Sequence, residues 1–388
     1  MTTSPLKIAI VAGERSGEKL ACGIVDEVAS VTGTMPELCG VGGPDLRFRG
    51  LNSLFDADEI ALMGFVEVAK RLPRLVRRIS QTARHIVDEN PDVLLLVDSP
   101  DFSLRVAKKV READPSIKIV KYVSPTVWAW RPERAAKMAK FVDHVLALFP
   151  FEPSVMRELV GPDTTYVGHP LIFDEALMAV REARRQRREP RPDDGINLVC
   201  LPGSRSWEIS KLIDDMGATV EALISRGNRL TITIPTLPKH VDMIRRETAA
   251  WRASVDITVD REGQMAAYLE ADVALCASGT VTLELALAQV PAVSIYRTDA
   301  AIRVFFHLVQ AWSAALPNII GDKPIIPEFY DHLIRPGMLA RHLEGLGHSQ
   351  STTRRSVIEG YDLVLERMQV AEPPEALAVS TILDVIGK

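Results

Sequence analysis

Short apolar runs rich in β-branched residues alternate with stretches of helical periodicity along the whole chain. In the first half, the apolar runs predict strands at 6–12, 93–97, 117–123, 142–148 and 164–167. The stretches between them predict helices near 17–30, 72–90, 101–113, 131–140 and 152–160. Because the runs lack the alternation of a half-exposed strand, they indicate a parallel sheet with helices on both faces. We therefore expect a doubly wound α/β domain.

The pattern starts again after Gly168-His169-Pro170 and a charged stretch at 181–192. Further strands are predicted at 196–200, 230–235, 255–258, 272–276 and 292–296. Helices are predicted at 206–226, 238–252, 262–270 and 280–289, with two more near 351–369 and 374–386. The repetition predicts a second α/β domain of similar size.

The composition is that of an ordinary globular protein: 388 residues, 47% hydrophobic, 25% charged, with a net charge of −5. Neither half has the basic excess that general nucleic-acid binding needs. The four cysteines form no C-x-x-C pair and adjoin apolar runs, which argues against zinc and favours free, buried thiols. The chain has no run of about 18 apolar residues and no secretory signal. We expect a soluble or peripheral protein in a reducing compartment.

The loops after strands are the candidate sites, because ligands of open α/β sheets bind beyond the carboxyl ends of the strands. After the first strand, Gly13 and Gly17 permit close approach of a sugar or phosphate to a helix start. In a purely structural alternative, Ser16 caps that helix and Glu18 lies in its first turn. Both interpretations stay open.

A carboxylate, Asp98, follows the apolar strand at 93–97. The tip of a central strand is where a general base belongs, so its position favours a catalytic role. Asp101, three residues further on, is better placed to cap the next helix. For Asp98 as well, a cap or Asx-turn is the structural alternative.

Two of the five tryptophans, Trp128 and Trp130, fall within three residues in the stretch 122–131. Because aromatic side chains are costly to expose, they cover something. They either pack the loop on its own domain, form a wall of the binding site, or offer an apolar surface to a lipid chain.

In the second half, Gly203, Ser204 and Arg205 follow a predicted strand and open a helix. Glycine permits close backbone approach, the helix start faces an anion, and an arginine makes bidentate phosphate contacts. The combination predicts a diphosphate site. A surface arginine after a turn is the plainer alternative.

Ser278, Gly279 and Thr280 repeat this arrangement at the next helix start, and Glu284 follows about one turn later. A carboxylate there can accept from two ribose hydroxyls, or it can merely complement the helix dipole, worth about 0.3–1 kcal/mol. The chain has no Walker pattern, and no D-x-D pair follows a strand. We therefore predict a metal-independent glycosyltransferase that uses a nucleotide sugar.

These motifs resemble the lipid-A-disaccharide synthase family, inverting glycosyltransferases of Gram-negative bacteria. YVSPTVWAWR at 122–131 and LPGSR at 201–205 are the most specific matches. Further matching segments lie, in order, at 11–18, 40–44, 62–68, 98–102, 148–152, 167–171, 277–284 and 316–318. One departure is Glu18, where the family usually has Asp, which keeps the acidic character but alters the fit of the loop.

The resemblance implies a GT-B fold, in which two Rossmann-like doubly wound domains face each other across a cleft. Residues 1–168 would bind the acceptor, 169–350 the UDP-sugar donor, and the helices at 351–388 would return to the first domain. The implied reaction transfers 2,3-diacylglucosamine from UDP to the 6-hydroxyl of 2,3-diacylglucosamine 1-phosphate, with inversion. The products would be lipid A disaccharide 1-phosphate and UDP, and no metal or other cofactor would be needed.

The resemblance also implies roles for individual residues. Asp98 would take the proton of the acceptor hydroxyl, with Glu14 and Ser16 beside it. The donor-binding residues would be Gly203, Ser204, Arg205, Ser278, Gly279, Thr280, Glu284 and Asn318. The residues that meet the acceptor or a membrane would be Met63, Phe65, Glu67, Arg74, Arg77, Arg78, Trp128, Trp130 and Arg131.

Acylated substrates require contact with a bilayer, and residues 68–87 fit that requirement. They carry six basic and no acidic side chains, interleaved with apolar ones, as in helices that bind anionic lipid. A solvated helix face is the commoner alternative. The apolar stretch 304–316 predicts core or dimer packing, or contact with an acyl chain. We expect a peripheral protein at the cytoplasmic face of the inner membrane, with no nucleic-acid partner.

Two other functions fit the same fold pattern. A UDP-sugar 2-epimerase shares the diphosphate-binding loops but leaves the basic stretch and the tryptophans without a purpose. A non-catalytic carrier of nucleotide sugars or lipids leaves Asp98 without one. Whether the chain forms a homodimer has no decisive mark in the sequence.

Overall fold

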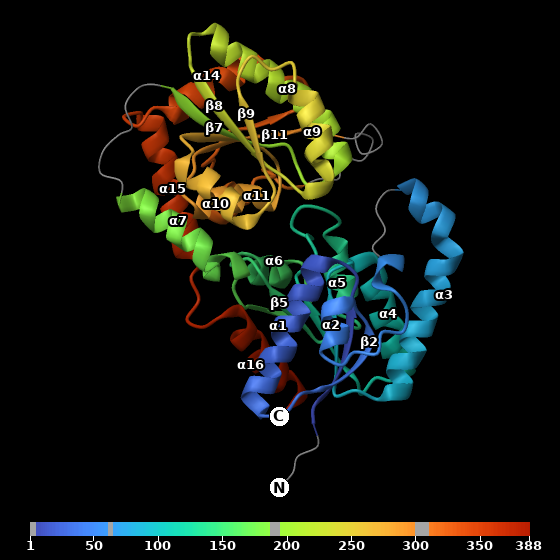
Figure 1. The fold of residues 1–388 in the computed structure, drawn as a ribbon. Helices are drawn as coiled ribbons and strands as arrows, with labels where there is room; N and C mark the ends of the chain where they lie inside the picture. Colours follow the sequence, from blue (N-terminus) through green and yellow to red (C-terminus); the bar gives the residue numbers. More distant parts are fainter. Residues whose placement is uncertain (1–4, 61–64, 187–194, 299–309) are drawn as a thin grey trace. The chain divides into compact units, whose positions relative to one another are not determined.

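The computed structural model describes residues 5–60, 65–186, 195–298 and 310–388, and for 65–72 it describes the backbone alone. The chain divides into two compact units, each built on a six-stranded parallel sheet (Figure 1). Unit 1 comprises Met1–His169 and Val370–Lys388, and unit 2 comprises Pro170–Gln369. Among the described helices, none is long and apolar enough to cross a membrane.

The sheet of unit 1 has the strand order β2-β1-β3-β4-β5-β6, with parallel neighbours throughout. Its strands are β1 (Lys7–Ala12), β2 (Glu37–Val41), β3 (Val93–Val97), β4 (Lys118–Tyr122), β5 (His144–Ala147) and β6 (Asp163–Tyr166). The order reverses between β1 and β3, which is the switch point where such sheets bind ligands. Ala12 pairs with Val97, so the loops after both strands begin at the same edge.

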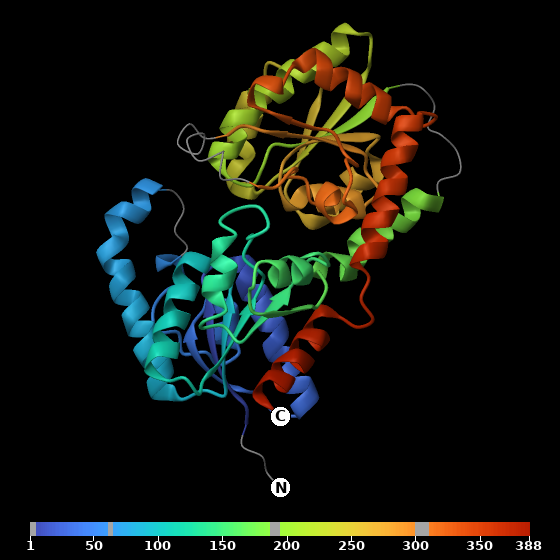
Figure 2. The ribbon, with the colours of Figure 1, turned by 180° about the vertical axis from the view of Figure 1, so that it is seen from behind.

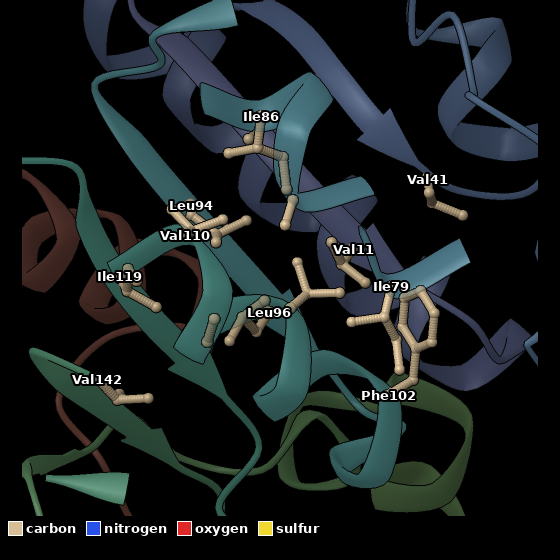
Figure 3. Close-up of a cluster of buried hydrophobic side chains, with 14 of the residues drawn as sticks. Val11, Val41, Ile79, Ile86, Leu94, Leu96, Phe102, Val110, Ile119 and Val142 are labelled. Atoms are coloured by element: carbon tan, nitrogen blue, oxygen red, sulfur yellow. The ribbon is translucent and has the colours of Figure 1, made fainter. Parts of the chain in front are cut away.

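Helices cover both faces of this sheet. They are α1 (Arg15–Thr32), α2 (Pro44–Phe48), α3 (Phe65–Glu89), α4 (Pro100–Ala113), α5 (Glu133–Met138), α6 (Glu152–Glu158) and α16 (Pro374–Ile386). On one face, Leu94 and Leu96 of β3 pack with Ile86 of α3 and with Phe102 and Val110 of α4 (Figure 3). On the other face α16 lies beside α1 (Figures 1 and 2).

The sheet of unit 2 has the order β12-β11-β10-β7-β8-β9, again with parallel neighbours. Its strands are β7 (Ile196–Leu201), β8 (Leu230–Pro235), β9 (Val255–Thr258), β10 (Val273–Ala277), β11 (Ala292–Tyr296) and β12 (Glu328–Tyr330). Its helices are α7 (Glu175–Gln186), α8 (Ser206–Ser225), α9 (Val241–Thr248), α10 (Arg261–Glu270), α11 (Thr280–Leu287), α13 (Leu316–Gly321), α14 (Pro336–Gly347) and α15 (Thr352–Met368). The switch point lies between β7 and β10, where Leu201 pairs with Cys276.

Both doubly wound sheets predicted from the hydrophobic pattern are confirmed, and β3, β8, β9 and β11 have the predicted bounds. The four cysteines are free and buried, as expected. The prediction missed β2 and β12, because the first contains a glycine in a run of only five residues and the second has three residues. It also missed α7 and α14.

The two C-terminal helices lie in different units, whereas residues 351–388 were predicted to belong together with the first domain. Only α16 packs in unit 1. α15 packs on α11, α13 and α14 of unit 2, where Val357, Tyr361 and Val364 are buried. The Tyr361 hydroxyl donates to the Val290 carbonyl at 3.2 Å. The division between the units therefore falls after Gln369, not at residue 351.

Candidate active site

Asp98 lies at the switch point of unit 1, at the end of β3. It has φ 53°, and Ser99 has φ 36°, so two successive non-glycine residues adopt the sparsely populated left-handed conformation. The carboxylate accepts hydrogen bonds from the Gly13 and Glu14 amides, at 3.2 Å each. A Cβ on Gly17 would lie 1.7 Å from Asp98 Oδ2. Only glycine at position 17 therefore leaves room for this carboxylate over the start of α1.

Lys121 of β4 lies behind Asp98 and is 1% exposed. Its ammonium donates to the carbonyl oxygens of Asp98 at 3.0 Å, Tyr122 at 3.1 Å and Leu96 at 3.4 Å. Burial lowers the pKa of Lys121 to about 7. Burial also raises the pKa of Asp98, while the Ser99 side chain, the Lys121 charge and the two loop amides oppose that rise. The pKa of this carboxyl group is therefore higher than that of an exposed aspartate.

The helix start after β1 is not capped by Ser16. The N-cap position belongs to Glu14, whose side chain makes no capping bond, and both side chains are exposed. Instead, Asp98 from the neighbouring strand binds the amides before the helix. Glu18 is buried and accepts from the Leu46 amide at 3.0 Å. The glutamate that departs from the family pattern therefore supports the start of α2.

Asp101 does not cap α4, contrary to the prediction. The N-cap residue is Ser99, with no side-chain capping bond. Asp101 is exposed and forms a salt bridge with Arg134 at 2.7 Å. The left-handed turn at Asp98 and Ser99 explains the difference, because it shifts the helix start to Pro100.

The tryptophan loop packs largely on its own unit. Trp128 is half-buried and meets the Phe151 ring edge-on, with centroids 5.4 Å apart. The Arg131 guanidinium lies 5.1 Å from the Trp130 ring centroid. Beneath the loop, the fully buried Glu152 accepts two backbone amides, and burial raises its pKa to about 8. The alternative of packing on the same domain is therefore correct for Trp128, while Arg131 is exposed.

At the first switch-point loop of unit 2, the amides before α8 are bound by a carboxylate of the same helix. Glu208 accepts from the Ser204 amide at 3.1 Å and from the Arg205 amide at 3.3 Å. It also forms a 3.5 Å salt bridge with Arg205, whose side chain remains 45% exposed. Gly203 has φ 119°, and a Cβ there would lie 2.6 Å from Glu208 Oε2. Glu208 was not among the predicted site residues, although an acidic residue three positions after the N-cap is a capping signal.

The second switch-point loop of unit 2 is the more open one. Gly279, with φ 139°, begins α11 without a side-chain cap, and no atom of the described chain lies within 4 Å of a Cβ built on it. The Ser278 hydroxyl donates to the Ala314 carbonyl at 3.1 Å. Gly279 and Thr280 are exposed. The structure thus brings Ser278, Gly279 and Thr280 together with Arg205 at one sheet edge, as predicted.

Glu284 lies in α11 with one carboxylate oxygen engaged. Its Oε2 accepts from Gln264 Nε2 at 3.1 Å and from the Tyr268 hydroxyl at 3.3 Å. Arg261 Nη1 lies 3.7 Å from the same oxygen. Burial raises the pKa of Glu284. Within the described residues, Oε1 has no hydrogen-bond partner, so one oxygen is available to a ligand.

Asn318 has a structural role, contrary to the prediction that it contacts the nucleotide. It is 2% exposed. Its amide oxygen accepts from the Ile325 and Ile326 amides, and its Nδ2 donates to the Ile326 carbonyl and to Glu328. The amide oxygen and nitrogen of this side chain are thus both hydrogen-bonded within unit 2. The position of Asn318 in the sequence gave no sign of these bonds.

The basic stretch of α3 is partly neutralised. Arg78 binds Glu59 through two hydrogen bonds of 2.8 Å and lies over the Phe55 ring. Arg74, 63% exposed, shares Glu59 at 3.0 Å, and Arg77 is exposed. Arg78, predicted to meet the acceptor or a membrane, is instead engaged by Glu59, and the sequence did not show that Glu59 would reach it. Met63, the side chains of Phe65 and Glu67, and residues 304–309 lie outside what the structure describes.

A small pocket of unit 2, missed from the sequence, lies beside these loops at the ends of β10 and β11. Trp207 and Lys211 of α8, with Tyr296 and Arg297 after β11, are among its lining residues. Asp215 holds Arg297 through bonds of 2.5 and 2.7 Å. No three histidine, cysteine, aspartate or glutamate side chains of the described residues cluster as a metal site requires.

The family model described as lipid-A-disaccharide synthetase matches residues 8–371. The chain belongs to this family. The lipid-A-disaccharide synthase of Rhodospirillum centenum is 38% identical over 386 residues, covering 99% of this chain and 96% of that protein. The one from Ruegeria pomeroyi is 34% identical over 390 residues, covering 98% and 95%. This chain is therefore a hexosyltransferase of lipid A biosynthesis, and the epimerase and carrier alternatives are not favoured.

Solved structures agree on the two-domain GT-B fold. MurG of Acinetobacter baumannii has a TM-score of 0.57 at 15% identity, with 99% of each chain covered. The calicheamicin glycosyltransferase CalG4 has a TM-score of 0.57 at 14% identity, with 100% and 99% covered. The UDP-GlcNAc 2-epimerase of Neisseria meningitidis, solved with UDP-GlcNAc, has a TM-score of 0.54 at 13% identity, with 98% and 99% covered. At these identities the likeness concerns the fold alone.

Proposed function

We propose that this member of the lipid-A-disaccharide synthase family transfers 2,3-diacylglucosamine from UDP to the 6-hydroxyl of 2,3-diacylglucosamine 1-phosphate. The anomeric carbon would be inverted, and lipid A disaccharide 1-phosphate and UDP would be released. The observation that carries the proposal is the pair of switch points in a chain of this family. One presents a desolvated carboxylate and the other presents open helix amides with an arginine.

Asp98 is the proposed general base. As the acceptor oxygen attacks the anomeric carbon, its proton passes to the Asp98 carboxylate and the bond from carbon to the UDP oxygen breaks. The two loop amides and the absence of room beside Gly17 hold the carboxylate in one orientation. Because burial raises its pKa, it is a stronger proton acceptor than an exposed aspartate.

Negative charge develops on the departing diphosphate, and unit 2 offers the groups that stabilise it. The open start of α11 supplies amides and the positive end of the helix dipole. Arg205 supplies a guanidinium that can exchange Glu208 for phosphate oxygens. Glu284 Oε1 is proposed to accept a ribose hydroxyl. These groups together would neutralise the leaving group without a metal.

The acyl chains of both substrates call for a membrane surface. We propose peripheral binding at the cytoplasmic face of the inner membrane through the outer face of α3, where Arg74, Val76 and Arg77 are exposed. Opposite them Ile79 and Ile86 are buried in the core of unit 1. The Arg78–Glu59 pair would anchor the helix rather than bind lipid.

Release of UDP from UDP-2,3-diacylglucosamine, measured with and without the acylated acceptor phosphate, tests the proposal. We expect UDP to appear only when both substrates are present, together with a disaccharide phosphate of the summed mass. UDP release from the donor alone, or conversion of the donor without UDP release, would overturn it.

Binding to anionic vesicles tests the membrane contact. The double variant Arg74→Glu with Arg77→Glu should bind them more weakly than the wild type, with Lys108→Glu on α4 as the control. Unchanged binding of the double variant would exclude the membrane contact.

A further inference from the structure

The ammonium of Lys121 is buried and is bound by main-chain carbonyl oxygens. Among the described residues no carboxylate lies within 4.0 Å of it, and three main-chain carbonyls accept its hydrogen bonds instead. Taking a charged group out of water is costly unless its surroundings compensate it. An apolar side chain would suit the middle of this sheet better, as at the neighbouring Val120 of the same strand. The cost of burying this amine therefore suggests that it has a functional role.

The carbonyls that bind Lys121 lie around one structural irregularity. Those of Leu96 and Asp98 belong to the end of β3, where the chain enters the left-handed turn at Asp98 and Ser99. The Asp98 carbonyl also accepts the Ser103 hydroxyl at 2.9 Å. Two donors thus fix the main chain of Asp98, one from the neighbouring strand and one from α4. Backbone in this conformation persists only where its surroundings hold it.

We propose that Lys121 is the positioning residue of Asp98, fixing the strained turn at the end of β3 through the Asp98 carbonyl so that the carboxylate faces the reacting hydroxyl. The inference rests on the proposed function, since it assumes that Asp98 is the base. Lys121 touches no substrate, and it acts through the main chain and the field at Asp98. The positive charge of Lys121 lowers the pKa of the Asp98 carboxyl group, and the negative charge of Asp98 raises the pKa of the Lys121 amine.

The test compares Lys121→Met, which removes donor and charge, with Lys121→Gln, which keeps a donor and removes the charge. We expect Lys121→Met to lower kcat at least tenfold with little change in donor KM, and Lys121→Gln to recover part of that loss. Because the positive charge of Lys121 opposes protonation of Asp98, the acid limb of the kcat profile should move to higher pH in both variants. Lys118→Met, at the exposed start of the same strand, is the matched control.

A purely structural lysine gives a different result. The melting temperature and the active fraction then fall, but the acid limb stays at the wild-type pH, and this outcome overturns the inference. UDP binding to unit 2, measured on each variant, shows whether the chain has folded. If Lys121→Met does not fold, the pH profile of Lys121→Gln decides. An inactive wild-type chain would instead refute the proposed function. An active Asp98→Asn variant would refute the assignment of Asp98 as the base.

Discussion

Units 1 and 2 carry parallel sheets of closely related order, and at the switch point of each a carboxylate binds backbone amides. In unit 1 the carboxylate of Asp98 comes from the neighbouring strand and binds the loop before α1. In unit 2 the carboxylate of Glu208 comes from the helix itself, and the adjacent start of α11 stays uncapped. The same architecture therefore presents a carboxylate held by two amides in one unit and an uncapped helix start in the other.

This difference assigns opposite chemistry to two similar loops. Glycines after the first strand suggested close approach of a phosphate, but Asp98 fills that space and would repel an anion. In unit 2 the proposed anion would meet Arg205 and the α11 amides, and Glu208, 3.5 Å from the Arg205 guanidinium, would give up that contact to it. A glycine near a helix start thus indicates that some group lies close to the backbone there. Whether that group is a ligand or a side chain of the protein depends on the residue at the end of the neighbouring strand.

The largest expected effect comes from removing the negative group of unit 1. Asp98→Asn should lower kcat by about 10²–10⁴-fold, the usual contribution of a general base, with UDP affinity unchanged. Asp101→Asn, three residues away in the first turn of α4 but exposed and paired with Arg134, is the control and should stay near wild type. Single-turnover assays with circular dichroism as a folding check make the comparison. Near-normal turnover of folded Asp98→Asn would remove the base assignment.

Displacing that group rather than removing it should cost less. In Gly17→Ala the new Cβ would lie 1.7 Å from Asp98 Oδ2, so the carboxylate must move. Misplacing a catalytic group by about 1 Å can cost about 10²-fold, and we expect a kcat loss of that order. The control is Gly337→Ala, whose added Cβ meets no atom within 4 Å. A wild-type kcat in Gly17→Ala would show that the position of the carboxylate does not matter.

On the side of unit 2, the expected losses are in affinity. Hydrogen bonds to charged groups contribute about 1.5–3 kcal/mol, so Arg205→Ala should weaken UDP binding about 10–100-fold. Calorimetric titration measures this, with the exposed Arg245→Ala on α9 as the control. Equal affinities of the two variants would mean that the diphosphate binds elsewhere.

The smallest effect concerns the carboxylate of α11. Tyr268→Phe removes one hydrogen bond to Glu284 Oε2 and should weaken UDP binding about 2–10-fold. The loss should be smaller for a UDP analogue that lacks the ribose hydroxyl bound by Glu284. Tyr361→Phe, equally buried in unit 2 but bonded to the Val290 carbonyl, should leave the ratio of the two affinities unchanged. If the ratio of the affinities for UDP and for the analogue is also unchanged in Tyr268→Phe, Glu284 does not bind the ribose.

Much of this molecule could be predicted from local sequence. The apolar runs located all the described strands except β2 and β12, and the glycine and hydroxyl residues after them marked both switch points. Local sequence did not show which side chains are engaged by another segment of their own unit. Asn318 binds the loop at 325–328, and Arg78 binds Glu59. In each case the residue type suits a ligand contact equally well, so its spacing in sequence does not distinguish the two roles.

The sequence by itself determined the family, the two parallel sheets and the loops in which chemistry lies, because periodicity and motif spacing are local properties of the chain. Only the tertiary structure decided which amides are already occupied and which remain open. Asp98 and Gly13 are 85 residues apart in sequence, and it is the pairing of β1 with β3 that brings them within 3.2 Å. Hydrogen-bond partners across a switch point follow from strand order and loop conformation, which arise from the packing of the whole sheet.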